Sequence, residues 1–299
     1  MLKIFGQTRK HEGDGDKPNE DVFGFNRWGF VALGDGVTRS RATDGTYPVH
    51  VAKVAPNTFL AAMLAEYCEF QGGVLEMFLR NAFKKANETI TIASEEQGVT
   101  SHTVDYGVTD YLGTTGVCLL VHEGRAALAY IGDPIALYLP KGGTPRLLTT
   151  DQLKPCHRFG KPHFSAMVSS TVSQKEVNNR RTFWQRSQVR NNPAAIDPSG
   201  NLIGFGVLTG EPSALEFLQI VELQVQPGDR FILSSDALRA AGCFDNDDEG
   251  VHSYAPALEA ISSIPFEGWP SALIDLIRHC EVRDKVRSDD ATVVVAEVI

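Results

Sequence analysis

Residues 30–36 read FVALGDG: four apolar residues, a glycine, and an aspartate followed by a second glycine. A similar order returns as LAYIGD at 128–133 and as FILSSD at 231–236. Short apolar runs that are rich in β-branched or aromatic residues and bounded by Gly, Pro or Asp are typical of β-strands. Each of the three aspartates is therefore expected directly after a strand, near the surface but anchored by the core.

Other apolar runs predict the rest of the sheet system. Turn-like residues at 26–29 and 122–125 join neighbouring runs, so hairpins are expected from 22–25 with 30–33 and from 115–121 with 126–131. Further strands are predicted at the following ranges: 135–139, 218–225, 231–234 and 291–298. Strands joined by tight turns indicate largely antiparallel sheets.

Three segments have helical spacing. Apolar residues recur every four positions from Val74 to Ile90, which predicts an amphipathic helix over 74–93. A second helix is expected over 51–67, with Pro56 either kinking it or marking its start. A third is expected over 270–280. Because strands lie before, between and after these helices, the helices are expected to pack on the outer faces of the sheets, which predicts an α+β layered sandwich.

The segment from 151 to 201 has a different composition. It is rich in Ser, Asn, Gln and Arg and shows little periodicity. We expect a long surface excursion that is too polar to form a core of its own. The 299 residues are accordingly predicted to form a single domain.

Composition argues against several classes of protein. The formal net charge of −9, from 37 acidic and 28 basic residues, argues against a nucleic-acid partner. No apolar run reaches the roughly 18–20 residues that a membrane span requires, and the first residues lack the apolar core of a secretory signal. Five scattered cysteines without a CxxC pair fit reduced thiols. We therefore expect a cytoplasmic protein with neither nucleic acid nor membrane as partner.

Acidic residues also stand directly before two predicted strands, as Asn19-Glu20-Asp21 and Ser288-Asp289-Asp290. The end of one antiparallel strand lies beside the start of the next, so these acids and the strand-end aspartates can meet at one edge of the fold. Clustered carboxylates repel unless cations neutralise them, and Mg²⁺ or Mn²⁺ prefers oxygen ligands. Two such ions suffice to activate a water and polarise a phosphoryl group. Taken singly, each motif is equally typical of a turn or a helix cap.

Taken together and in order, the motifs resemble those of the metal-dependent protein phosphatases (protein phosphatase type 2C, the PPM family) in their bacterial form. The resemblance extends from about residue 19 to residue 297. The matching motifs are Asn19-Glu20-Asp21, Val31–Gly36, Gly113-Thr114-Thr115, Ile131-Gly132-Asp133, Leu148–Asp151, Pro227-Gly228-Asp229 with Phe231–Asp236, and Asp289–Thr292.

The resemblance implies a four-layer α-β-β-α sandwich with two central, mainly antiparallel sheets, and a binuclear Mg²⁺ or Mn²⁺ site at one end. It implies hydrolysis of phosphoserine and phosphothreonine in a phosphoprotein, in opposition to a Ser/Thr kinase. The segment after Asp151 would contain a flap beside the site. The catalytic residues it implies are Asp35, Asp236 and Asp289.

The resemblance also implies a ligand for each ion. Asp35 would bridge the two ions and the Gly36 carbonyl would bind one of them, while Asp236 and Asp289 would complete the other. Glu20 and Asp21 would act directly or through waters, and Asp133 would share a third, weaker ion with Asp236.

Several positions depart from the family pattern. The arginine expected before the first acidic motif, where it would bind the substrate phosphate, has no match. Lys17 lies one position away and offers a point charge in its place, with Arg9 as a second candidate. Ala237 replaces a glycine, Val37 replaces a histidine found in many relatives, and Asp290 replaces an asparagine.

Other functions remain open at this stage. The eight histidines show no HxxxH or HExxH spacing, which disfavours a zinc hydrolase. A catalytically silent regulatory module of the same fold is the main alternative, and a nucleotide phosphoesterase is a third. Arg180, Arg181 and Arg186 either contact a phosphoprotein substrate or belong to a solvated loop.

Overall fold

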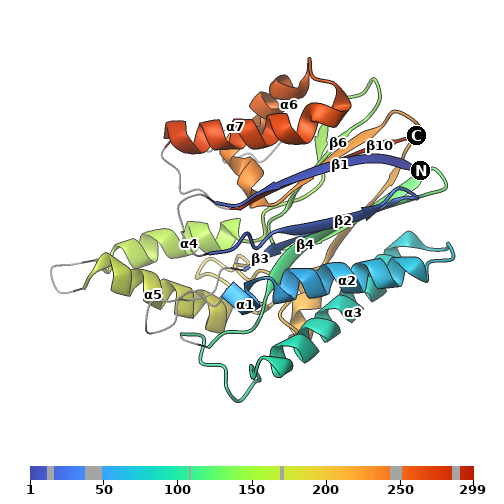
Figure 1. The fold of residues 1–299 in the computed structure, drawn as a ribbon. Helices are drawn as coiled ribbons and strands as arrows, with labels where there is room; N and C mark the ends of the chain where they lie inside the picture. Colours follow the sequence, from blue (N-terminus) through green and yellow to red (C-terminus); the bar gives the residue numbers. More distant parts are fainter. Residues whose placement is uncertain (12–16, 38–48, 108, 169–171, 243–250, 285–289) are drawn as a thin grey trace.

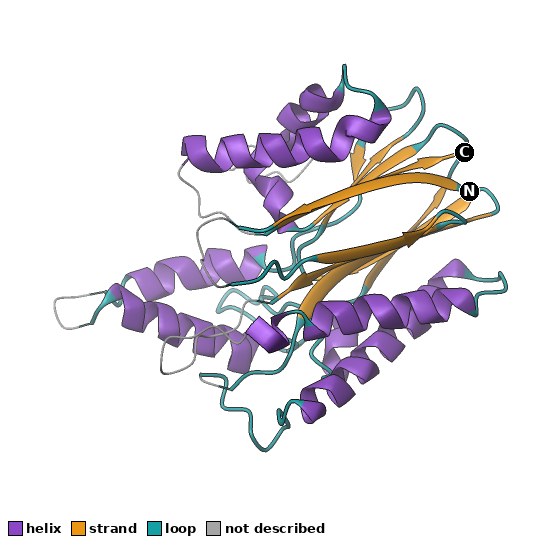
Figure 2. Ribbon diagram, in the orientation of Figure 1, coloured by secondary structure: helices purple, strands orange, loops and turns teal. Residues whose placement is uncertain are grey.

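The structure is a computed structural model that describes residues 1–11, 17–37, 49–107, 109–168, 172–242, 251–284 and 290–299. Its centre consists of two five-stranded sheets lying face to face, with helices outside both (Figures 1 and 2). Neighbouring strands in both sheets pair antiparallel. The predicted fold class, a four-layer α+β sandwich, is confirmed.

The first sheet contains, in spatial order, β1 (Leu2–Arg9), β10 (Ala291–Val298), β9 (Arg230–Ser234), β6 (Ile135–Leu139) and β7 (Arg146–Leu147). The second contains β2 (Val22–Asn26), β3 (Phe30–Gly36), β4 (Thr114–His122), β5 (Arg125–Ile131) and β8 (Gln219–Gln224). Each predicted strand is present. The sequence analysis did not predict β1 or β7, both of which lie at the edges of the first sheet.

The α-helices are α1 (Val49–Ala52), α2 (Val54–Cys68), α3 (Leu75–Glu96), α4 (Lys154–Ser165), α5 (Gln174–Trp184), α6 (Ala255–Ile261) and α7 (Trp269–Asp284). A π-helical turn covers Gln185–Val189, and 3₁₀ helices cover Pro212–Phe217, Asp236–Ala241, Val251–Tyr254 and Phe266–Gly268. The three predicted helices correspond to α3, α7 and the α1–α2 pair, and Pro56 lies in the first turn of α2, where it leaves no hydrogen bond unmade.

Alternation along the strands builds three apolar layers. In β4, Val117 and Leu119 face the other sheet and pack with residues such as Phe231 and Val294. The intervening Cys118 and its neighbours face outward, against α2 and α3. A third cluster packs the outer face of the first sheet against α6 and α7. A side-chain period of two therefore places alternate residues of one strand in two different layers.

Two glycines let a helix approach the second sheet closely. Gly34 and Gly116 are paired across β3 and β4, and the fully buried ring of Phe59 from α2 lies over them. A Cβ atom would lie 3.1 Å from this ring at Gly34 and 2.9 Å at Gly116. The aromatic ring therefore fills the space that the two missing side chains leave, one residue before Asp35.

The segment 151–201 is more ordered than its composition predicts. It forms α4 and α5, which project as a pair from the end of the sandwich opposite the two termini (Figure 1). Its buried side chains Cys156 and Val189 pack in an apolar cluster with Ile203, Phe205 and Val207, which lie outside the segment. Ser173 begins α5 by accepting a hydrogen bond from the Glu176 N–H at 3.2 Å, a helix-starting Ser-x-x-Glu pattern.

Among the described helices, none combines the length and the apolarity that crossing a membrane would require.

Candidate functional site

Acidic residues of the second sheet lie at the end of the sandwich from which α4 and α5 project. Asp35 and Gly36 are the last residues of β3, and Asp21 immediately precedes β2, whose first residue pairs with Gly34. Gly36 is in close contact with Glu20, because a Cβ on this glycine would lie 2.7 Å from the Glu20 Cβ. Any larger residue at position 36 would displace Glu20. We call this end of the sandwich the acidic rim.

The first sheet supplies acids to the same rim. Asp236 follows β9 and begins a 3₁₀ helix, while Asp290 immediately precedes β10. The two strand ends are joined beyond the regular ladder by reciprocal hydrogen bonds: the Ser235 N–H donates to the Thr292 carbonyl at 3.1 Å, and the Thr292 N–H donates to Ser235 Oγ at 3.1 Å. Asp236 and Asp290 are therefore held at neighbouring strand ends.

Asp21 connects the two sheets through its side chain. It precedes a strand of the second sheet, yet its carboxylate hydrogen bonds to Ser235 and Thr292 of the first and lies close to Asp290 and Asp236. Asp21 is 3% exposed, and its pKa is raised from 3.8 to about 7. Burial is the main cause, the hydrogen bonds from Ser235 and Thr292 lower the pKa, and the charges of Asp290 and Asp236 raise it. Its Oδ2 has no hydrogen-bond partner within the part of the chain that the structure describes.

Asp290 organises the segment that precedes β2. Its Oδ1 accepts from the His11 N–H at 2.8 Å, and its Oδ2 accepts from the Glu20 N–H at 2.7 Å. Lys17 Nζ lies 3.1 Å from Glu20 Oε2 and 3.9 Å from Asp290 Oδ2. Lys17 and Glu20 are both buried. The sequence analysis expected Asp290 at this edge of the fold, because it directly precedes a strand, but assigned it no metal-binding or catalytic role.

Asp133 lies in the turn between β5 and β6 and is linked to the 3₁₀ helix after β9. Arg239 of this helix donates from Nη2 to the Asp133 carbonyl at 3.2 Å and places Nη1 3.4 Å from Asp151 Oδ2. The adjacent Gly132 has a φ of +88°, and a Cβ there would lie 2.4 Å from Thr115, the partner of Asp35 in the ladder. The turn is thus fixed against the second sheet.

The predicted residues differ in how far the structure brings them together. Asp21, Asp236, Glu20 and Lys17 converge around Asp290, and Gly36 lies against Glu20. Asp289 lies outside the described residues. Arg9, the second candidate for binding the substrate phosphate, instead pairs with Glu281 of α7 at 2.7 Å. Among the described residues, no three Asp, Glu, His or Cys side chains are close enough to hold a metal ion.

The chemistry of the rim nevertheless fits a hard divalent cation. It offers carboxylate oxygens and the carbonyl of Gly36, which are the donors that Mg²⁺ and Mn²⁺ prefer. The unpartnered Asp21 Oδ2 and the repulsion that Asp21 receives from Asp236 and Asp290 are both relieved by a bound cation.

No family model matches the sequence, and no curated protein matches it. Solved structures match over the whole length. The catalytic domain of the serine/threonine phosphatase PstP, solved with two manganese ions, is 21% identical, with a TM-score of 0.63 and coverage of 100% of this chain and 98% of that one. PstP/Ppp from Mycobacterium tuberculosis is 20% identical, with a TM-score of 0.65 and coverage of 99% and 98%.

A third similar structure, the serine/threonine phosphatase of S. agalactiae, is 17% identical, with a TM-score of 0.62 and full coverage of both chains. The likeness extends over the whole arrangement of two antiparallel five-stranded sheets between helices. The chain has the fold of the bacterial PPM-type serine/threonine phosphatases.

Proposed function

We propose that this chain is a metal-dependent phosphatase that hydrolyses phosphoserine and phosphothreonine in proteins, and so opposes a Ser/Thr kinase. The observation that carries the proposal is Asp21, a buried carboxylate of one sheet that lies among Asp236 and Asp290 of the other. Burying repelling carboxylates destabilises a fold unless a cation offsets the repulsion. The ordered motif set and the fold of known serine/threonine phosphatases support the same proposal.

The acidic residues of the rim would bind the ions as follows. Asp35, with the Gly36 carbonyl, and Asp236 with Asp289 would hold two Mg²⁺ or Mn²⁺ ions, assisted by Glu20 and Asp21 directly or through waters. Asp133 would contribute to a third, weaker site. Bound ions of this kind supply a water of lowered pKa and polarise the phosphoryl group.

Lys17 would orient the substrate phosphate. Its ammonium is buried at the rim beside Glu20 and Asp290, so its position is fixed by two carboxylates. An ammonium attracts phosphate as a point charge and lacks the two-pronged geometry of arginine. Lys17→Ala should therefore raise KM for phosphopeptides, and Lys17→Arg should restore part of the loss.

The decisive experiment is hydrolysis of p-nitrophenyl phosphate and of a phosphothreonine peptide with and without added Mn²⁺. We expect activity that depends on Mn²⁺ and that Asp35→Asn and Asp236→Asn each abolish. Asp275→Asn, at an exposed position on α7, is the matched control and should retain activity. If either rim variant turned over at the wild-type rate with Mn²⁺ present, the proposed site would be wrong.

The alternatives give different results in the same assays. A silent regulatory module would show no Mn²⁺-dependent hydrolysis of any phosphate ester. A nucleotide phosphoesterase would prefer nucleotides to the phosphopeptide. Thermal unfolding with and without Mn²⁺ adds a readout that needs no turnover, because a cation that binds only the folded state raises Tm.

A further inference from the structure

The pair of helices α4 and α5 carries a charge opposite to that of the chain as a whole. Residues 154–184 contain six Lys or Arg and one Glu, whereas the chain has a net charge of −9. The one acid, Glu176, already pairs with Arg180 of its own helix at 2.6 Å. We call these two helices the basic hairpin.

Three cations of α4 share one face of the helix. Lys154, Arg158 and Lys161 are spaced i, i+4 and i+7, the spacing of side chains that lie above one another on a helix. Arg158 and Lys161 are exposed, and Lys154 is half-buried. On the neighbouring helix α5, Lys175 is exposed as well. The row on α4 is about 10 Å long at 1.5 Å per residue, which equals the length of about three residues of an extended peptide.

Arg186, which the sequence analysis weighed as a substrate contact, instead belongs to a buried charge cluster that also contains Arg190. Arg186 Nε lies 3.0 Å from Asp110, and Arg190 donates to both oxygens of that carboxylate at 3.0 and 2.7 Å. This buried cluster ties the π-helical turn after α5 to the segment before β4. The exposed positive charge of the basic hairpin is thus separate from the charge that fixes the hairpin in place.

Several charged groups face His157. Its pKa is lowered chiefly by burial of the ring; the charge of Asp151 opposes this, while the charges of Arg181, Arg239 and Lys161 each lower the pKa further. Cations from α4, from α5 and from the 3₁₀ helix after β9 therefore outnumber the one acid that faces this ring.

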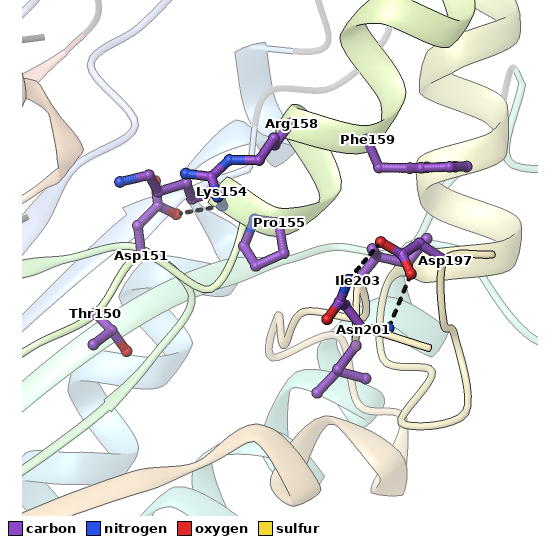
Figure 3. Close-up of a pocket in the computed structure, with 10 residues that line it drawn as sticks. Thr150, Asp151, Lys154, Pro155, Arg158, Phe159, Asp197, Asn201 and Ile203 are labelled. Carbon is purple, nitrogen blue, oxygen red and sulfur yellow. Dashed lines mark hydrogen bonds between the residues drawn. The ribbon is translucent and has the colours of Figure 1, made fainter. Parts of the chain in front are cut away.

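A pocket of about 680 Å³ lies at the foot of α4, a volume within the range of ligand sites. Figure 3 shows Lys154 and Arg158 on one wall and Asp197 and Asn201 on the facing wall. The Asp197 carboxylate is occupied by Asn201, whose backbone and side-chain N–H groups donate to it at 2.9 and 3.0 Å. The wall formed by α4 carries the two cations of the lining, Lys154 and Arg158.

The pocket adjoins the acidic rim. Asp151, on its lining, lies 3.4 Å from Arg239, which also binds the Asp133 carbonyl. The next residue, Gln152, accepts the Gly132 N–H at 2.9 Å. A peptide chain bound at the rim can therefore reach the pocket and the hairpin without leaving the surface of the molecule.

We propose that the basic hairpin and the pocket at its foot form a docking surface for an acidic stretch of the substrate protein, next to the phosphorylated residue. The inference rests on the proposed function and adds to it a class of substrate. The pocket favours a peptide over a nucleic acid, because its lining mixes cations with Pro155, Phe159 and Ile203, a surface that accepts side chains of varied chemistry.

The test compares two phosphothreonine peptides that differ only in having four Asp and Glu residues, or four Gln and Asn residues, beside the phosphothreonine. The variant Arg158→Gln/Lys161→Gln/Lys175→Gln removes three hairpin cations. Its matched control, Arg80→Gln/Lys84→Gln/Lys85→Gln, removes three exposed cations from α3. We expect the wild-type protein and the control to have a higher kcat/KM for the acidic peptide at low salt. In the hairpin variant the ratio of kcat/KM for the two peptides should be about tenfold smaller, the size of effect expected for the loss of three exposed ion pairs.

An unchanged preference in the hairpin variant, or an equal loss in the α3 control, would overturn the docking surface. Fluorescence anisotropy with the unphosphorylated acidic peptide separates this outcome from failure of the proposed function. If no phosphate ester is hydrolysed but the peptide binds and the hairpin variant weakens binding, only the phosphatase proposal fails. Tighter binding of a single-stranded DNA of equal charge would assign the surface to nucleic acid instead.

Discussion

Asp21 makes a prediction that tests the acidic rim without any assay of activity. Its pKa lies at about 7 in the folded protein, against 3.8 ordinarily. Each pKa unit corresponds to about 1.4 kcal/mol, so ionisation of Asp21 costs the metal-free fold about 4 kcal/mol. Below pH 3.8 Asp21 is protonated in both the folded and the unfolded chain, so its titration does not lower the free energy of unfolding. As pH rises towards 7 the unfolded chain ionises first, so the free energy of unfolding falls, and the loss is complete above pH 7.

Asp21→Asn removes this titration while it keeps the size of the side chain. Relative to wild type, we expect the metal-free variant to gain about 2–3 kcal/mol of stability as the pH is raised from about 5 to about 8. Urea unfolding at the two pH values measures this gain. Asp275→Asn, on the exposed face of α7, is the control and should show no comparable change.

Added Mn²⁺ should counteract the loss of wild-type stability at high pH. A bound cation neutralises the rim carboxylates, and metal binding strengthens as its ligands lose their protons. Wild type should therefore gain more stability from Mn²⁺ at about pH 8 than at about pH 5, and Asp21→Asn should gain less than wild type. If the stability difference between variant and wild type stayed constant across this pH range, the electrostatic description of the rim would be wrong.

Three further predictions concern stability, each measured by urea unfolding. Tyr138→Phe removes a hydrogen bond of 2.7 Å to the buried carboxylate of Asp229, and a lost bond to a charged group should cost about 1.5–3 kcal/mol; a loss below about 0.5 kcal/mol would contradict this. Asp110→Ala leaves the guanidinium of Arg190, which is 6% exposed, without its bidentate partner, and should cost about 3–5 kcal/mol, whereas the double variant with Arg190→Met should recover part of the loss. Phe59→Ala opens a cavity above the glycine pair of β3 and β4 and should cost about 3–5 kcal/mol; a smaller cost would mean that α2 can move inward to close the space.

Most of the sheet system could be predicted from the sequence because its strands are local apolar runs. The apolar run at 30–33 is followed by Gly34 and an Asp-Gly pair, and this pattern needs no knowledge of the rest of the fold. β1 lacked such a signal. It is an edge strand in which the polar residues Gln7 and Thr8 dilute the apolar pattern, and its place depends on β10, almost the whole chain away.

The basic hairpin was missed for a different reason. Its core depends on contacts between Phe159 and Trp184, whose ring centroids are 6.0 Å apart, and between Phe164 and Trp184, at 5.4 Å. These contacts join α4 to α5, two helices that lie within a segment of polar composition. One local signal was available: Ser173 and Glu176 form the Ser-x-x-Glu pattern that begins α5.

The candidate site was predictable as a set of residue types but not as a geometry. The strand-end rule placed Asp21 and Asp236 at the same end of the sandwich. It did not single out Asp290, whose hydrogen bonds reach back to the N–H groups of His11 and Glu20, 279 and 270 positions away. Such partners are set by the packing of the two sheets and leave no trace in local sequence.

The position of β10 has a consequence for biosynthesis. This strand inserts between β1 and β9, so during synthesis β1 lacks this partner until the distant residues of β10 have been added. Pairings of such long sequence separation form slowly. Asp290 arrives with this final insertion, and only then do the backbone amides of His11 and Glu20 receive their acceptors. A ribosome-bound or prematurely terminated product that lacks β10 would thus carry an unassembled rim, which couples formation of the site to the insertion of β10.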